Sequence, residues 1–160
     1  MRRGARIALC AALALLLALA CAGEEEAATS TYPTAEVTIG IHRIEVEVAD
    51  TPERRSRGLS GRSRLAEGRG MVFSYAGAER YGFWMQGMRF DIDIVWIRGD
   101  RIVDVSSRVP HDPPGELPVY RPREPADLVL EVPSGIVERL GWRIGDRVTM
   151  APSPRSATAG

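Results

Sequence analysis

The feature that most constrains the fold is the stretch from Phe83 to Ile97, which reads FWMQGMRFDIDIVWI. It holds two of the chain's three Trp and two of its five Met. From Met88 to Ile94 apolar and charged residues alternate, and a period of two places successive side chains on opposite faces of a β-strand. An apolar run follows from Val95 to Ile97, as is typical of a strand that is buried on both faces. The stretch therefore predicts the central strand of a β-sheet.

The N-terminus has the charge pattern of a secretory signal peptide over residues 1–20. Arg2, Arg3 and Arg6 precede an uncharged run of mostly Ala and Leu from Ile7 to Gly23, which matches the basic and apolar regions of an export signal. A mature transmembrane helix is disfavoured, because the run is at the short end of what a bilayer needs and three Glu follow it directly. We therefore predict that the protein is exported to the cell envelope.

Cys21 ends this segment in the sequence LALAC, which resembles a bacterial lipobox. In such a motif the Cys is diacylated and becomes the mature N-terminus, and two or more acyl chains give lasting membrane attachment. Ala18 and Ala20 could instead form the A-x-A site of ordinary signal peptidase. We predict lipidation at Cys21, so that the protein contacts the membrane through its N-terminal lipid.

Composition excludes several classes of function. Cys10 lies in the removed segment and Cys21 would be a thioether, so the mature chain has no thiol for a disulfide, a metal or a nucleophile. Removing three of the 21 basic residues leaves 18 against 21 acidic residues, a net charge of about −3. This charge does not suggest nucleic-acid binding.

The mature chain divides into three parts. Residues 21–35 contain the lipidated Cys and an acidic, polar stretch that cannot bury enough apolar surface to order itself, which predicts a flexible tether. Residues 36–150 are long enough for one domain with a single core. Residues 151–160 are rich in Pro, Ser and Ala, and they predict a disordered tail.

Within the domain, short alternating segments predict strands that are separated by Gly and Pro. Asp50 or Thr51 followed by Pro52 predicts a short helix that Gly58 ends, and Ser134 predicts the cap of a second short helix. No long amphipathic helix is apparent, so the sequence predicts a mainly β, compact single-domain β-sandwich or barrel-like fold with two short helices. The predicted strands cover residues 37–39, 44–48, 71–75, 88–97, 102–105 and 128–132, with a last strand ending near 150 and a long Pro-rich loop over 110–125.

Four blocks, in order along the chain, carry a family resemblance. Residues 49–65 read ADTPERRSRGLSGRSRL, residues 70–73 read GMVF, residues 83–97 are the block described above, and residues 130–146 read LEVPSGIVERLGWRIGD. Together they resemble the motifs of the domain-of-unknown-function family 192 (DUF192), whose members are small bacterial and archaeal proteins that often carry signal peptides. The resemblance implies a compact, mainly β single domain, and it implies no activity.

Three positions depart from the family's pattern. Ser60 stands where Met is usual, Gln86 where Lys is usual and Asp91 where Pro is usual. If the family's function uses the Lys cation, this chain has lost that cation or replaced it with an amide.

Asp91 and Asp93 are the candidate carboxylates. Two residues apart on a strand, they would point to the same face with carboxyls about 6 to 7 Å apart, a spacing that could hold a hard cation or the acid and base of a glycosidase. The favoured interpretation is a solvated face on which Arg89 balances the charge, with Asp93 the better candidate for a buried hydrogen-bond acceptor that organises the sheet or a binding site. His42 and His111 form no metal-binding motif. We therefore predict no catalytic residue, no metal and no cofactor.

The favoured binding hypothesis lies where a polar amide and a bare backbone, Gln86 and Gly87, interrupt the apolar face. A small concave site there would be lined by Trp84 and Met85 and closed by Tyr120. The other aromatic and thioether side chains of the block are predicted to be core. The predicted binding residues are Trp84, Met85, Gln86, Gly87, Asp93 and Tyr120.

Three functions stay open at this point. The first is a noncatalytic envelope domain that binds a small molecule, a peptide or a partner protein. It predicts a pocket edged by Trp84, Gln86 and Tyr120, with Asp91 exposed. The second is a carboxylate-dependent hydrolase or lyase, in which Asp93 would converge with Asp91 or Glu131 in a cleft. The third is a purely structural envelope protein, which predicts no pocket.

Overall fold

The computed structural model describes residues 32–152, and this part of the chain is mainly β with two short helices, as the sequence predicts. The predicted signal peptide (1–20), the lipidation site Cys21, tether residues 22–31 and tail residues 153–160 lie outside the described residues. Neither helix of residues 32–152 has the length and hydrophobicity that a membrane span requires. The elements are β1 (Thr34–Ile39), β2 (His42–Ala49), α1 (Pro52–Arg57), β3 (Arg69–Glu79), β4 (Ile92–Arg98), β5 (Arg101–Val109), β6 (Ala126–Pro133), α2 (Ile136–Leu140) and β7 (Val148–Pro152).

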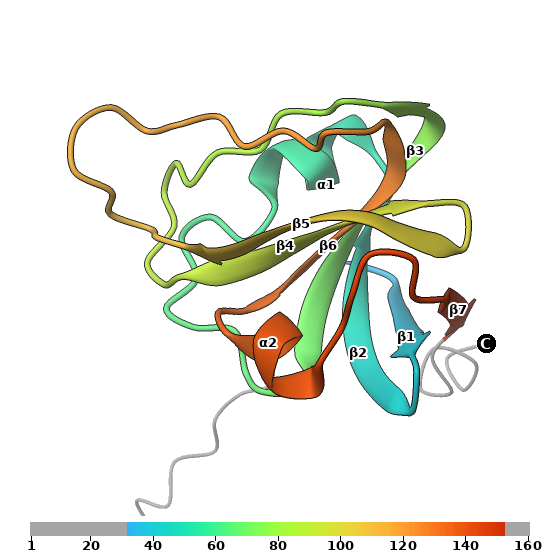
Figure 1. Cartoon of the computed structure of the whole chain (residues 1–160). Coiled ribbons are helices and arrows are strands. Elements are labelled where there is room, and N and C mark those ends of the chain that lie inside the picture. Colours follow the sequence, from blue (N-terminus) through green and yellow to red (C-terminus); the bar gives the residue numbers. More distant parts are fainter. Residues whose placement is uncertain (1–31, 153–160) are drawn as a thin grey trace, which may run out of the picture.

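The seven described strands form one curled sheet in the order β5-β4-β6-β3-β2-β1-β7 (Figure 1). Every neighbouring pair is antiparallel except β2 and β3, which run parallel and are joined through α1. The sheet curls until β5 at one edge meets the turn that leads into β7 at the other edge: Ile102 N donates to Asp146 O at 3.0 Å, and Gly145 N donates to Ile102 O at 2.8 Å. The fold is therefore a partly closed barrel made of a single sheet, and not a sandwich of two sheets.

Each face of the sheet carries an apolar cluster, and the two helices lie on opposite sides of β4 and β6 (Figure 1). The α2-side cluster takes buried residues from all seven described strands and from α2. The α1-side cluster consists mainly of residues from β3, β4 and β6, covered by Leu59 and by the segment before β4. Burial of a large apolar side chain contributes about 1.5–3 kcal/mol, so both clusters stabilise the fold. The largest fully buried side chain, Trp96, belongs to the α1-side cluster.

The ends of α1 follow directly from the local sequence. Thr51 is the N-cap, and its Oγ1 accepts a hydrogen bond from Arg54 N at 3.3 Å. Pro52 occupies the first turn, where its missing N–H costs nothing. Gly58 ends the helix at φ 49°, and a Cβ there would lie 3.3 Å from Cζ of Phe73. The predicted limits of this helix are confirmed, and the chain after it is held close to β3.

The start of α2 differs from the prediction. The N-cap is Gly135, no side chain caps the helix locally, and the predicted cap by Ser134 is therefore wrong. Instead, the buried carboxylate of Asp93 accepts a hydrogen bond from Val137 N at 3.0 Å. The first N–H groups of a helix lack partners within the helix and carry partial positive charge, so an acid from β4 replaces a local cap.

β4 begins later than the alternation from Met88 predicts, because residues 88–91 form a loop. Met88 N donates to Met85 O at 3.1 Å, which closes a turn. The Asp91 carboxylate accepts from His111 N at 2.9 Å and lies 2.6 Å from His111 Nδ1. The strand that follows is buried from Ile92 to Ile97, so the predicted burial of the apolar run is confirmed.

The ordered domain extends slightly beyond its predicted limits at both ends. β1 begins at Thr34, within the segment predicted as a tether, and Tyr32 before it is buried. β7 continues to Pro152, within the predicted tail, because Pro152 pairs with Ala35 of β1.

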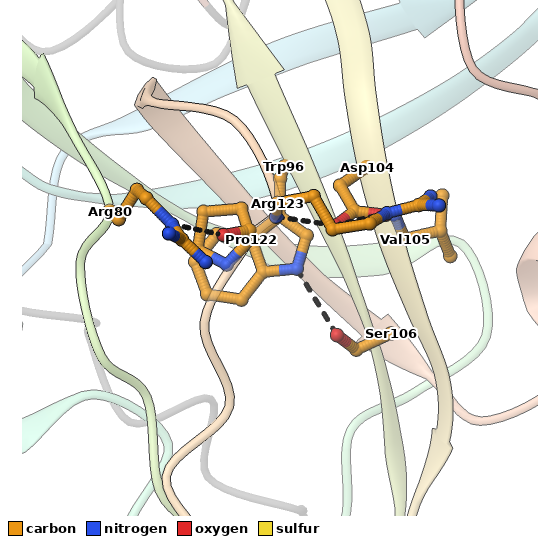
Figure 2. A network of polar contacts seen from close by, with 7 residues as sticks. All are labelled: Arg80, Trp96, Asp104, Val105, Ser106, Pro122 and Arg123. Carbon is orange, nitrogen blue, oxygen red and sulfur yellow. Dashed lines mark hydrogen bonds and ion pairs between the residues drawn. The ribbon is translucent and has the colours of Figure 1, made fainter.

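The Pro-rich loop between β5 and β6 is tied to the sheet by a polar network (Figure 2). The Arg123 guanidinium pairs with Asp104 of β5 at 2.7 Å, and Arg80 Nε donates to Pro122 O at 2.8 Å. Burial alone would raise the pKa of Asp104, but the hydrogen bonds from Arg123 and from backbone N–H groups outweigh it and lower the pKa. The loop is thereby held against the side of the sheet that contains Trp96.

Candidate functional site

A cleft of about 270 Å³ opens on the α1 side of the sheet, between the C-terminal end of α1 and the segment before β4. Residues of β3 and β6 form its floor. A larger hollow of about 480 Å³ lies at the turn between β1 and β2, but none of the buried acidic residues lines it. The lining of the first cleft includes Arg55, Ser60, Tyr75, Phe83, Trp84 and Glu131.

Glu131 is the buried carboxyl at the floor of this cleft. It lies between Met71 of β3 and Ile94 of β4 in the sheet register, and 6% of its surface is exposed. Among residues 32–152 no side chain or backbone group donates a hydrogen bond to its carboxyl. Burial raises the pKa of Glu131 to about 8, because an ionised carboxylate is disfavoured away from water. At neutral pH the side chain is therefore mostly protonated, and it can both donate and accept a hydrogen bond.

Aromatic rings form one wall of the cleft. Phe83 meets Phe73 edge to face with ring centroids 4.9 Å apart, and it meets Trp96 in the same way at 5.3 Å. Trp96 is itself fixed, because its indole N–H donates to Ser106 Oγ at 3.2 Å (Figure 2). Trp84 stands at the edge of the cleft with 62% of its surface exposed. An exposed Trp next to an apolar wall offers a face on which a ligand can stack.

Arg55 and Tyr75 form the polar side of the cleft. Arg55 Nη1 donates to two backbone carbonyls, both at 2.8 Å, and its guanidinium lies 4.9 Å from the centroid of the Tyr75 ring. Burial raises the pKa of Tyr75 to about 12, Arg55 opposes this rise, and the nearby acid Glu131 adds to it. Arg55 is thus held by neutral carbonyls and an aromatic face, and no ion pair joins it to Glu131.

The segment predicted as a binding site borders the cleft, but only Trp84 of the predicted residues lines it. Gln86 is exposed, and its backbone carbonyl accepts from Ser60 Oγ at 2.8 Å. Gly87 has φ 73°, a conformation that other residues rarely adopt. Two of the three positions that depart from the family's pattern, Ser60 and Gln86, are therefore in direct contact and fix this segment against the end of α1.

The other predicted binding residues do not line the cleft. Met85 is 2% exposed and belongs to the α1-side cluster. Tyr120 exchanges backbone hydrogen bonds with Phe83 at 2.9 and 2.7 Å, so it helps to hold that residue of the aromatic wall in place. Asp93 is fully buried on the opposite face, where its Oδ1 accepts from Arg108 N at 2.7 Å.

The candidate carboxylates do not converge. Asp93 points toward α2, whereas Glu131 points into the cleft on the α1 side. Asp91 lies before β4, has a side chain 49% exposed and pairs with His111, so it does not share a strand face with Asp93 as predicted. The geometry contradicts an acid–base pair of Asp93 with either residue, and it corrects the solvated-face interpretation for Asp93. The hypothesis of Asp93 as a buried hydrogen-bond acceptor is confirmed.

The sequence-based prediction includes Glu131 only as a partner for Asp93, and it does not place Glu131, Arg55 and Tyr75 in a cleft. A signal exists in the sequence, since Glu131 interrupts the apolar run of β6, where a buried strand is expected to be apolar. Arg55 and Tyr75 have no comparable signal, because their local sequence resembles that of any surface Arg or core Tyr. In the described part of the chain, no group of three His, Cys, Asp or Glu could hold a metal.

Comparison with known proteins identifies the family of this chain. Residues 35–150 match the model of DUF192, which is described as "Uncharacterized ACR". The chain belongs to the DUF192 family. This description assigns no activity, and no curated protein matches the sequence.

Two solved structures are similar to this DUF192 domain. One, from Sinorhizobium meliloti 1021, is described as a "putative transcription regulator"; it is 29% identical with a TM-score of 0.69, and the match covers 76% of this chain and 96% of that chain. The other is a protein of unknown function from Novosphingobium aromaticivorans DSM 12444, 28% identical with a TM-score of 0.64, and the match covers 72% of this chain and 83% of that chain. Both structural matches support the partly closed barrel fold described above.

Proposed function

We propose that this DUF192 protein is an exported, lipid-anchored envelope protein whose domain binds a ligand in the Glu131 cleft without catalysing its conversion. The observation that carries the proposal is the Glu131 carboxyl. The residue is 6% exposed, its carboxyl opens to the cleft and receives no hydrogen bond from the described residues, and the exposed Trp84 lines the same cleft. Buried polar groups are paired in the great majority of folded proteins. An unpaired carboxyl in an open cleft therefore offers a hydrogen bond that a ligand can complete. The signal-peptide pattern and the lipobox-like sequence before Cys21 support the envelope location.

The two alternative functions have weaker support. Glycoside hydrolysis needs two carboxyl groups about 5 to 9.5 Å apart, and Glu131 is the only acidic side chain among the described residues that line the cleft. A purely structural role predicts no pocket, and it gives no reason for a large exposed aromatic side chain next to a buried acid.

Native mass spectrometry of protein purified from its own membrane tests the binding function. We expect a co-purifying mass on the wild-type protein and its loss from Trp84→Ala, because that change removes the stacking face. Ile144→Ala is the matched control, since Ile144 is 56% exposed and lies outside the cleft. Absence of a bound mass on the wild-type protein would contradict the proposal, as would an equal loss from both variants.

The lipid anchor is tested separately from the cleft. We expect Cys21→Ser to leave the protein soluble or unprocessed, because the acyl chains can no longer be attached. Membrane fractionation measures this, and unchanged membrane association of the variant would refute the anchor.

A further inference from the structure

The row of side chains that contains Glu131 holds a second buried glutamate. In the sheet register, Glu47 of β2 pairs with Met71 of β3, and Met71 pairs with Glu131 of β6. Directly paired residues point to the same face of a sheet, so Glu47 and Glu131 both point to the α1 side. Glu47 is 8% exposed and Glu131 is 6% exposed. Two glutamates of similar burial therefore occupy the same row and face, with one strand between them.

Glu47 is paired with a guanidinium group of the protein itself, that of Arg62. Arg62 donates from Nη1 to Oε1 of Glu47 at 2.9 Å and from Nη2 to Oε2 at 2.6 Å. The same guanidinium lies 5.8 Å from the centroid of the Tyr32 ring. A bidentate guanidinium–carboxylate pair is among the stronger hydrogen-bonded arrangements in proteins, and an aromatic face adds cation–π attraction.

The Glu47 site combines a buried carboxyl, an aromatic ring and a cation, and the Glu131 site has the first two but lacks the cation. Aromatic rings line its cleft, but no cation of the described chain reaches its carboxyl. The charged and titratable groups that face it are Arg55 and Arg57 from α1, Tyr75 from β3 and the already paired Glu47 from β2. Arg55 is engaged by two carbonyls and by Tyr75, and burial alone accounts for the raised pKa of Glu131.

We propose that the Glu131 cleft binds the guanidinium or primary ammonium group of a ligand, which pairs with the Glu131 carboxylate against the aromatic wall of Phe83 and Trp84. This inference rests on the proposed binding function and names the chemical class of its ligand. The bound cation takes the place that Arg62 takes on Glu47. A peptide carrying Arg or Lys and a small polyamine both present this group.

Binding of a cation is coupled to the loss of a proton. The cation pairs with the ionised carboxylate, whereas the free protein holds Glu131 protonated below its pKa of about 8. Each pH unit below that value therefore weakens binding by about tenfold, and above it the affinity levels off. A neutral ligand that accepts a hydrogen bond from the protonated acid shows the opposite dependence.

Methylguanidinium and N-methylurea form a matched pair of probes, since they have similar size and shape and differ in charge. Binding is followed through the ¹³C-methyl NMR signal of Met88, which lines the cleft. At pH 9 we expect methylguanidinium to bind at least about tenfold more tightly than N-methylurea, with the affinity falling toward pH 6 as described above. Saturation with methylguanidinium is also expected to lower the pKa of Glu131, measured from its side-chain ¹³C signal in the wild-type protein.

Glu131→Gln removes the charge and keeps the shape of the side chain, so it should abolish the preference for methylguanidinium. Glu116→Gln, at an exposed position in the Pro-rich loop, should preserve it. Equal affinity for both probes, or a Glu131 pKa that methylguanidinium leaves unchanged, overturns the inference. A bound mass that Trp84→Ala removes would still leave the proposed binding function standing in that case. Absence of any bound mass on the wild-type protein overturns the binding function itself.

Discussion

Asp93 and Glu131 are buried carboxyls on neighbouring strands of one sheet, and they differ in what surrounds their oxygens. Asp93 of β4 faces α2 and receives one backbone N–H on each oxygen, from Arg108 at 2.7 Å and from Val137 at 3.0 Å. Glu131 of β6 faces the cleft and receives no hydrogen bond from the described residues. The fold satisfies the first acid and leaves the second open to a ligand.

Under the proposed binding function, this difference separates an acid that holds the fold together from an acid that is available to a ligand. Asp93 caps a helix and holds Arg108, the only non-glycine residue between 32 and 152 with a positive φ, at 53°. Removing a buried acceptor leaves its donors unpaired, which costs about 1–3 kcal/mol for each group. Glu131 accepts no hydrogen bond from residues 32–152 and costs stability whenever it ionises, so we propose that its contribution lies in binding.

The largest expected effect concerns the pH dependence of stability. Between the ordinary pKa of Glu131, 4.5, and its folded value of about 8, the folded state keeps a proton that the unfolded chain has released. The free energy of unfolding should therefore fall as the pH rises through this window, by roughly 1.4 kcal/mol per pH unit from this group. Urea denaturation of the wild-type protein and of Glu131→Gln from pH 5 to 8 isolates the contribution of Glu131 to this pH dependence. Parallel curves for the two proteins would show that Glu131 does not titrate in this way.

On the other side of the comparison, Asp93→Ala should lower the free energy of unfolding by about 3 kcal/mol, because two buried N–H groups lose their acceptor. Urea denaturation at pH 7 measures the loss. Asp112→Ala, at an exposed position, should change it by less than about 0.5 kcal/mol. Arg108→Gly added to Asp93→Ala should recover part of the loss, because Gly accepts a positive φ. A loss under about 1 kcal/mol would mean that Asp93 is not essential to this face.

Glu47 is intermediate between Asp93 and Glu131 in how its carboxyl is paired. Its partner is the side chain of Arg62, whereas Asp93 accepts from the backbone and Glu131 from no described residue. We expect Glu47→Ala to destabilise the fold by about 2 kcal/mol, less than for a fully buried pair because the Arg62 side chain is 31% exposed. A double-mutant cycle with Arg62→Ala measures the coupling by urea denaturation. Strictly additive losses would show that the pair does not stabilise the fold, and the analogy between Glu47 and Glu131 would lose its basis.

The smallest effect on stability is expected for Trp84→Ala, within about 0.5 kcal/mol, because most of the side chain is already in water. Its effect on ligand retention should nevertheless be complete. Thermal denaturation measured beside native mass spectrometry separates the two effects. A marked loss of stability would assign Trp84 to the core and remove it from the binding site.

Much of the fold can be predicted from the sequence, because local rules decide it. The hairpin of β1 and β2, the limits of α1 at Thr51 and Gly58, and the burial of β4 follow from alternation and capping. The errors occur where a distant residue overrides the local pattern. His111 holds Asp91 in a loop despite its strand-like sequence, and Asp93 replaces the predicted Ser134 cap across 44 residues of sequence.

The candidate site is less predictable than the fold. Trp84 can be found from the sequence, because a large aromatic residue beside Gln86 and Gly87 suggests an exposed edge. The rest of the cleft comes from α1, β3 and β6, which are far apart in sequence and meet only through the parallel pairing of β2 with β3 and the antiparallel pairing of β3 with β6.

The sequence by itself determined the class of fold, the family and the chemical character of Phe83–Ile97, because periodicity, capping and motif order are properties of neighbouring residues. Only the tertiary structure decided which buried acid has its carboxyl oxygens hydrogen-bonded. Asp93 and Glu131 both interrupt apolar strands, and nothing local distinguishes them. Hydrogen bonding and desolvation depend on groups brought from other strands and helices. In the described part of the chain these groups donate hydrogen bonds to Asp93 and none to the Glu131 carboxyl, which borders the cleft.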